Sequence, residues 1–218
     1  MKVLALNGSH NKQGVTYHAL KLAGEELEKE GIGMDIIHCG GKNYASCNDC
    51  RSCRRVKEDG NMVERCVHKD IVNEILDMLP QYDGMLLGTS VHLMGIPGAF
   101  KCVLDRLSYC SNHYRTWRFK PTASITICRR AGAISVFHQL NNYLLSSHML
   151  VVGNQYWNIG FGWKPEEFLQ QDKEGVQTMR MLGMNMAWAL KIIDATKDTI
   201  RPPQHGLRAR TNFCRTLD

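Results

Sequence analysis

Short apolar runs alternate with amphipathic stretches from the first residues to about residue 196, and this alternation most constrains the fold. The apolar runs have the length of buried strands, and apolar side chains at helical spacing follow each run. Five strands that alternate with five helices predict a doubly wound, five-stranded parallel sheet in a three-layer α/β/α sandwich. The predicted strands are 2–6, 34–37, 84–88, 123–128 and 150–152, and the predicted helices begin after Gly14, near Ile71, at Pro97, after Gly132 and near residue 172.

The size of the chain fits one domain with a single core. It has 218 residues, of which 44% are hydrophobic, and it shows no internal repeat or linker. We expect one domain over residues 1–200 and a basic tail over 201–218. The tail carries four arginines against one aspartate, which accounts for +3 of the net charge of +6.

The composition also indicates a compartment and excludes some partners. The longest apolar runs, such as 149–152, are too short to span a bilayer, and the apolar N-terminal stretch is too short for a signal peptide. Nine cysteines, an odd number in a chain of this size, favour a reducing compartment. We therefore expect a cytoplasmic protein with no membrane partner. Because the positive charge outside the tail is dispersed, we expect no nucleic-acid partner.

The loop after the first predicted strand combines small residues with hydroxyl groups over residues 7–16. Its small residues allow a ligand to approach the backbone, Ser9 and Thr16 supply hydroxyls, and the following helix presents free N–H groups. These features suit a phosphate, although the loop matches neither the Rossmann glycine pattern nor the Walker loop. The alternative is an ordinary strand-to-helix turn in which Thr16 caps the helix.

Two further loops follow predicted strands at the same edge of the sheet. The loop over 89–97 places Leu93 and Met94 beside backbone donors, which suits a flat heteroaromatic ring. The alternative is that these two side chains cover the end of the next helix. The loop over 128–132 carries two adjacent arginines, which suit a reduced cofactor or a substrate phosphate; the alternative is a solvated surface.

A tight cysteine cluster is the most chemically specific feature of the sequence. Cys47, Cys50 and Cys53 are each separated by two residues, and Cys66 follows after twelve more. Closely spaced thiolates of this kind are typical of a [4Fe–4S] cluster, whereas zinc usually takes two well-separated pairs. The third reading is a set of reduced thiols near a bound ring, made reactive by neighbouring arginines that lower their pKa. We favour free thiols over a metal site here.

Several motifs in order along the chain resemble one known family. These are Asn7-Gly8-Ser9 with Gly14-Val15-Thr16, Leu87 through His92, Phe100-Lys101 through Asp105-Arg106, Tyr156-Trp157-Asn158, and Met184 through Trp188. The chain resembles the NADPH-dependent FMN reductase family of flavodoxin-like folds, and in particular its iron–sulfur-flavoprotein-like branch. The resemblance covers about residues 1–196 and implies a flavodoxin-like fold.

The same resemblance implies an FMN site built from the three loops. By resemblance the first loop binds the phosphate, the second cradles the isoalloxazine and the third closes over the ring. The chain departs from the family at three places: His10-Asn11 stand for its Pro-Arg, Val15 for the asparagine before the threonine, and His92 for an aromatic residue. One cation is thereby missing from the first loop, so we expect weaker phosphate binding. The implied residues are Ser9, Asn11, Gly14, Val15 and Thr16, then Ser90, Val91, His92, Leu93 and Met94, then Arg129, Arg130 and Gly132.

The function implied is an FMN-dependent oxidoreductase with NAD(P)H as its co-substrate. The electrons would pass to a quinone, a free flavin or another small acceptor, and no side chain need act as a general base. The resemblance also implies a homo-oligomer, a dimer or tetramer, in which Trp157 lies either in the core or at an interface. The alternatives are an iron–sulfur flavoprotein or flavodoxin-type electron carrier, and a redox sensor that works through the cysteines.

Overall fold

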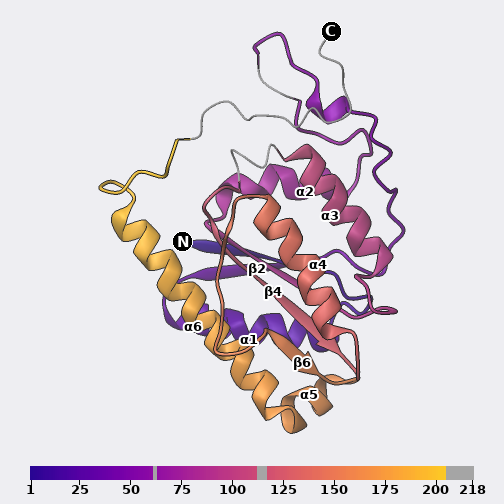
Figure 1. Ribbon diagram of the computed structural model, residues 1–218, viewed down its shortest axis with the longest axis vertical. Coiled ribbons are helices and arrows are strands. Elements are labelled where there is room, and N and C mark those ends of the chain that lie inside the picture. The colour runs from indigo at the N-terminus through magenta and orange to yellow at the C-terminus, as the bar shows by residue number, and fades with distance from the viewer. Residues whose placement is uncertain (61–62, 112–116, 205–218) are drawn as a thin grey trace, which may run out of the picture.

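Parallel strands form the centre of the molecule, as the computed structural model shows for residues 1–60, 63–111 and 117–204 (Figure 1). The strand order is β2-β1-β3-β4-β5, and β6 pairs with β4 beside β5. This order is that of flavodoxin-like sheets, so the predicted fold is confirmed. The strands are β1 Lys2–Asn7, β2 Gly33–His38, β3 Gly84–Ser90, β4 Pro121–Cys128, β5 Leu150–Val151 and β6 Ile159–Phe161.

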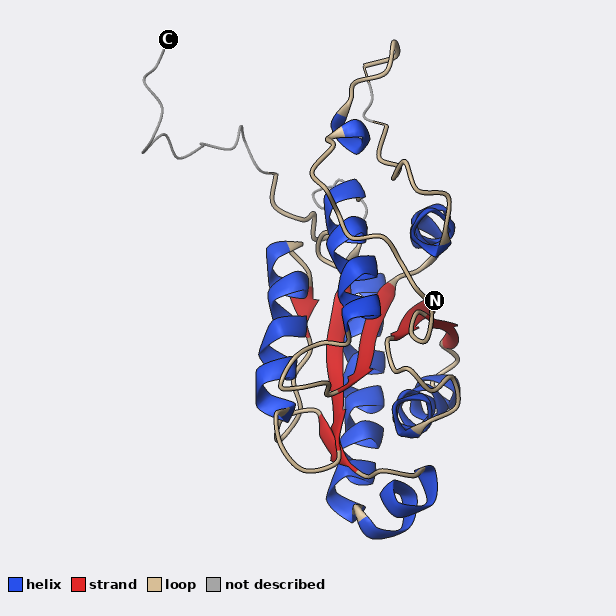
Figure 2. Ribbon diagram, turned by 90° about the vertical axis from the view of Figure 1, so that its right-hand side faces the viewer, coloured by secondary structure: helices blue, strands red, loops and turns tan. Residues whose placement is uncertain are grey.

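Helices cover both faces of the sheet, which Figure 2 shows nearly edge-on. Alternate side chains of β1 point to opposite faces, so Val3 packs with α1 and α6 while Leu4 packs with α2, α3 and α4. Both faces are therefore apolar, as a parallel sheet between two helical layers requires. The helices are α1 Val15–Lys29, α2 Ile71–Met78, α3 Gly98–Cys110, α4 Ala133–Ser146, α5 Pro165–Gln171 and α6 Lys173–Thr196, with 3₁₀ turns η1 Ser52–Arg54 and η2 Leu79–Gln81.

The fifth strand position differs from the prediction. The predicted strand 150–152 is shortened to β5, and β6 continues the same edge of β4 after the intervening segment 152–158. The sequence pattern predicted neither β6 nor α5. Both elements are short, and α5 buries only Phe168 among its seven residues, so neither produces a readable apolar period.

Among the described residues, no helix combines the length and the apolarity that a membrane span requires. Most of the predicted basic tail, residues 205–218, lies outside the described residues.

Helices α1 and α6 approach each other closely at Gly183. A Cβ atom at this position would lie 2.3 Å from the carbonyl oxygen of Ala23 and 2.9 Å from the Cβ of Glu26. Since a backbone atom is the obstacle, the two helices must separate to admit a side chain. The contact holds one whole helical layer against the sheet.

Substitution Gly183→Ala should lower the free energy of unfolding by about 1–3 kcal/mol, because it overpacks this contact. Urea unfolding followed by far-UV circular dichroism measures the change. Gly98→Ala is the matched control, since a Cβ at Gly98 in α3 meets no atom within 4 Å. Equal stabilities for G183A and the unmodified chain would contradict the close approach.

Candidate functional site

The loop between β1 and α1 is ordered by its own polar groups. The backbone N–H of Ser9 donates to Asn7 Oδ1 at 3.0 Å, and that of Asn11 donates to Ser9 Oγ at 3.3 Å. The backbone N–H of Gly14 donates to the Asn11 carbonyl at 3.2 Å. From the far side, His38 Nε2 lies 2.8 Å from the Ser9 carbonyl oxygen. The loop is thus held in one shape at the C-terminal end of β1.

The N-terminus of α1 leaves polar groups without partners. Gly14 is the N-cap, and no side chain caps the helix, so the alternative that Thr16 caps it is wrong. Thr16 is 1% exposed, and its Oγ1 has no hydrogen-bond partner among the described residues. A buried hydroxyl beside free helical N–H groups fits an anion such as a phosphate.

The loop after β3 ends in a tight hairpin turn. His92 and Gly95 exchange two backbone hydrogen bonds, at 3.0 and 2.8 Å. Between them, Leu93 and Met94 adopt left-handed conformations, with φ of 45° and 65°. Because Leu93 is fully exposed, it does not cover the following helix, and that alternative is wrong for this residue. Left-handed φ values at both central residues are typical of a type I′ hairpin turn, here without the usual glycine or asparagine.

The loop after β4 packs directly against this turn. At Gly132, with φ of 90°, a Cβ atom would lie 2.8 Å from Met94 Sδ and 2.9 Å from Val91 Cγ1. The hydroxyl of Ser135, in the first turn of α4, donates to the Met94 carbonyl at 2.7 Å. Gly132 is therefore required both for its backbone conformation and for contact between the two predicted ring-binding loops.

A cavity of about 380 Å³ opens where these two loops meet the segment around β6. Met94, Arg130 and Gly132 line it on the predicted side. The opposite wall contains aromatic side chains that no site prediction included, although Tyr156-Trp157 was one of the motifs carrying the family resemblance. Trp157 is 45% exposed, so it is not a core residue. The aromatic and apolar residues of that wall are Tyr156, Trp157, Ile159 and Phe161.

The two predicted cations of the third loop are exposed on the surface. Arg129 and Arg130 both lie open to solvent, and the guanidinium of Arg129 sits 5.6 Å from the ring centre of Trp163. Arg130 lines the cavity. The remaining predicted residues lie along the same edge: Ser90 and Val91 are half-buried, His92 is exposed, and Val15 is buried in the first turn of α1.

The four predicted metal-ligand cysteines come together in a second, separate place. Cys47, Cys50, Cys53 and Cys66 line one small cavity with a fifth cysteine, Cys110, from the last turn of α3. We call this group the thiol pocket. Sequence spacing gave no indication of Cys110, because it lies far along the chain and reaches the pocket only through the packing of α3.

The thiols of the pocket differ in their acidity. Burial raises the pKa of Cys110, whose thiol lies within hydrogen-bonding reach of the sulfurs of Cys53 and Cys66, and burial also raises the pKa of Cys53. The pKa of Cys50 is lowered, chiefly by hydrogen bonds from the backbone and side chain of Ser52. Arg54 does lower the pKa of Cys53, as expected, but burial outweighs it, and for Cys50 the lowering by Arg55 is the smallest of the causes.

The thiol pocket matches a metal cluster by its donor set and not by its open volume, which is about 20 Å³. Within the described parts of the chain, no three His, Cys, Asp or Glu side chains are arranged to share one metal ion. Four thiolates around one enclosed space are the donor set of a [4Fe–4S] cluster, which is larger than an ion and holds its ligands farther apart. By donor chemistry the pocket suits that cluster.

The thiol pocket and the three loops lie at opposite ends of the sheet. Helix α3 begins beside the second loop and ends at Cys110, and its thirteen residues span about 20 Å. In Figures 1 and 2, η1 lies at the end of the molecule away from β6 and α5. The expectation that the thiols lie near the bound ring is therefore wrong within one chain.

Comparison with known proteins relates the chain to flavoproteins. The family model for NADPH-dependent FMN reductases matches residues 1–164. An iron–sulfur flavoprotein of Methanocaldococcus jannaschii is 29% identical over 200 residues, which cover 88% of this chain and 99% of that protein. One from Archaeoglobus fulgidus is 29% identical over 208 residues, covering 91% and 98%.

Solved structures show the same fold at low sequence identity. RosB with a bound 8-demethyl-8-formylriboflavin-5'-phosphate superposes with a TM-score of 0.68 at 15% identity, covering 99% of this chain and 94% of that one. An archaeal flavodoxin gives a TM-score of 0.56 at 14% identity, covering 88% and 99%.

In the metal-free protein, Cys50 should be the first cysteine of the pocket to react with iodoacetamide. Its lowered pKa keeps more thiolate at neutral pH than an ordinary cysteine has, and reactivity is lost as the pH falls through that pKa. Ser52→Ala should move the rate profile to higher pH, whereas Ser46→Ala, a control within the pocket, should not. Peptide mass spectrometry reports the site, and earlier labelling of Cys110 would contradict the assignment.

Proposed function

The chain belongs to the NADPH-dependent FMN reductase family, and from this premise we propose that it is an FMN-dependent NAD(P)H oxidoreductase. Its electron acceptor would be a quinone, a free flavin or another small molecule. The observation that carries the proposal is the unpartnered, buried hydroxyl of Thr16 at the uncapped N-terminus of α1. It lies at the sheet edge where two further loops are in contact.

The first loop would hold the phosphate of FMN. The hydroxyl of Thr16 and the free N–H groups of the first turn of α1 are donors that a phosphate would accept from. Ser9 and Asn11 fix the loop around this position, and Gly14 lets the backbone approach. Lys12, in the first loop, is exposed, so solvent screens its charge and the helix N-terminus would supply most of the positive potential.

The second and third loops would orient the ring. Val91 and Met94 contact Gly132, so the two loops form a continuous surface. The backbone N–H groups of Leu93 and Met94, which donate to no backbone carbonyl among the described residues, would be available to ring oxygens and nitrogens. Bound FMN would supply hydride acceptance from NAD(P)H and electron release to the acceptor. The side chains of Arg129 and Arg130 would offset negative charge, although solvent screens both.

The cavity of about 380 Å³ beside these loops would admit the co-substrate or the acceptor. Its aromatic wall, with Tyr156, Trp157 and Phe161, suits a planar ring. We further propose a cytoplasmic homo-oligomer. The exposed apolar side chains Met184, Trp188 and Ile192 on α6 support assembly, since such residues in one helix mark contact surfaces.

A second candidate function is an electron-transferring iron–sulfur flavoprotein. The observation that favours it is that five cysteines line one cavity. The four predicted ligands are among them, although Cys66 lies farther along the sequence than the other three. The relatives named above carry this description, which supports the candidate. In this function Cys47, Cys50, Cys53 and Cys66 would hold the cluster.

Substitution Thr16→Val should weaken FMN binding by about tenfold to a hundredfold, because a hydrogen bond to a charged group contributes about 1.5–3 kcal/mol. The stability of the flavin-free protein should not fall, since the hydroxyl has no partner to lose. Thr126→Val is the matched control, a buried threonine of β4 whose Oγ1 also lacks a partner. Fluorescence titration with FMN measures both, and equal loss in the two variants would contradict the assignment.

The visible absorption spectrum of protein purified without oxygen separates the two functions. Two resolved flavin bands on adding FMN, without iron, indicate the oxidoreductase alone. Flavin bands on a broad shoulder, with about four iron atoms per chain, indicate the iron–sulfur flavoprotein. A colourless protein whose spectrum shows no binding of added FMN would contradict both functions.

A further inference from the structure

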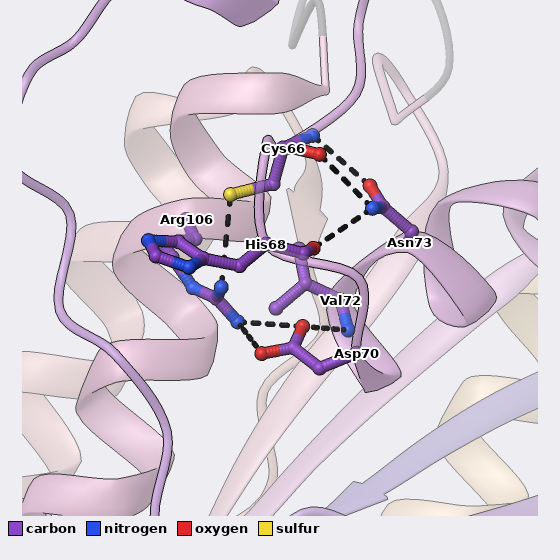
Figure 3. Close-up of polar contacts among 6 residues, drawn as sticks. All are labelled: Cys66, His68, Asp70, Val72, Asn73 and Arg106. Carbon is purple, nitrogen blue, oxygen red and sulfur yellow. Dashed lines mark hydrogen bonds and ion pairs between the residues drawn. The ribbon is translucent and has the colours of Figure 1, made fainter.

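A buried cation forms part of the wall of the thiol pocket. Arg106, on α3, is 1% exposed, and its Nη2 donates to both carboxylate oxygens of Asp70 at 2.7 and 2.6 Å (Figure 3). The same carboxylate accepts from the backbone N–H of Val72 at 3.1 Å and so caps α2. The guanidinium is therefore anchored to a fixed helix end.

Within the described parts of the chain, the other donors of Arg106 have no oxygen partner. Its Nη1 lies 3.6 Å from the sulfur of Cys66, and its Nε has no partner among the described residues. Leaving a buried donor without an acceptor costs about 1–3 kcal/mol, and more when the group is charged. Since Arg106 lines the thiol pocket, acceptors inside the pocket would satisfy this group.

Hydrogen bonds to Asn73 hold the backbone of Cys66 beside Arg106. The side chain of Asn73, in α2, accepts from the backbone N–H of Cys66 at 3.0 Å and donates to its carbonyl at 3.0 Å (Figure 3). Asn73 also donates to the carbonyl of His68 at 3.0 Å. The segment that carries Cys66 is thus fixed to the same helix that Asp70 caps.

We propose that Arg106 is a positioning residue for a cluster held by Cys47, Cys50, Cys53 and Cys66, an inference that rests on the second candidate function. It donates to the sulfur of Cys66, and its charge raises the reduction potential of the cluster. Reduction adds a single electron to a group that already carries the negative charge of its thiolates, and no bond forms or breaks. A nearby cation lowers the free energy of the more negative form.

Burial distinguishes Arg106 from the other cations around the pocket. Arg51, Arg54 and Arg55 are exposed or nearly so, and water and salt screen their charges. Arg106 is shielded from solvent, so its effect on a neighbouring charge is larger and depends little on ionic strength. Asp70 offsets part of this charge but binds Nη2, whereas the sulfur of Cys66 lies at Nη1 (Figure 3).

The experiment uses the full chain, reconstituted without oxygen with ferrous iron and sulfide. The variants are Arg106→Gln, which removes the charge, and Arg106→Lys, which keeps the charge but loses the fork of donors. Lys101→Gln is the matched control, because it removes a cation from the same helix that pairs with Asp105 at the surface. Iron and sulfide content are measured first, and the potential then follows from titration with dithionite, the electron donor.

The expected result is a more negative potential in R106Q than in the unmodified chain, an intermediate value in R106K, and no change in K101Q. The difference should persist at high salt. A lower cluster content with an unchanged potential of the loaded fraction would make Arg106 merely structural and overturn the proposal. If R106Q does not accumulate, a potential in R106K equal to that of the unmodified chain overturns it as well.

The same preparation shows whether the iron–sulfur function alone fails or the oxidoreductase function fails as well. An unmodified chain that takes up no iron and sulfide overturns this inference and the second candidate function together. Flavin bands on addition of FMN to that same protein would leave the proposed oxidoreductase standing.

Discussion

The parallel pairing of β1, β3 and β4 is the constraint on which both the three loops and the thiol pocket depend. Asn7 is paired with Gly88, and Ser90 with Ile127, so three loops leave the sheet at one edge. Helices must then return the chain along both faces, and both faces must be apolar. The same topology carries α3 from the loop edge to the opposite end, where its last turn meets the cysteines.

The two ends of the sheet differ in the positive charge that they place near polar groups. At the loop edge, free helical N–H groups and the hydroxyl of Thr16, unpartnered among the described residues, would suit a negative charge, and the loop's Lys12 is exposed. At the other end, a full positive charge on Arg106 is buried, Asp70 offsets it, and the sulfur of Cys66 lies 3.6 Å from its Nη1. A buried charge is tolerated only when it is paired and hydrogen-bonded, which explains why α2, α3 and the cysteine segment meet there.

Much of the fold could be predicted from the sequence because long elements repeat a period. The five strand positions, the strands' parallel sense and the five helices α1, α2, α3, α4 and α6 followed from apolar runs and helical spacing. Short elements such as β6 and α5 did not, since three or seven residues carry too little pattern. At the candidate site, the three loops were predictable because each follows a strand, whereas the aromatic wall comes from a segment that pairs with β4 only through tertiary contacts.

What the sequence by itself determined is the alternating architecture, the loop chemistry around Thr16 and the presence of a cysteine trio. These are local properties, set by neighbouring residues in the chain. Only the tertiary structure decided that Cys110 and Arg106 share a pocket with that trio, and that the pocket lies about a helix length from the loops. Distance in space between remote segments depends on how helices pack on the sheet, and no local pattern encodes it.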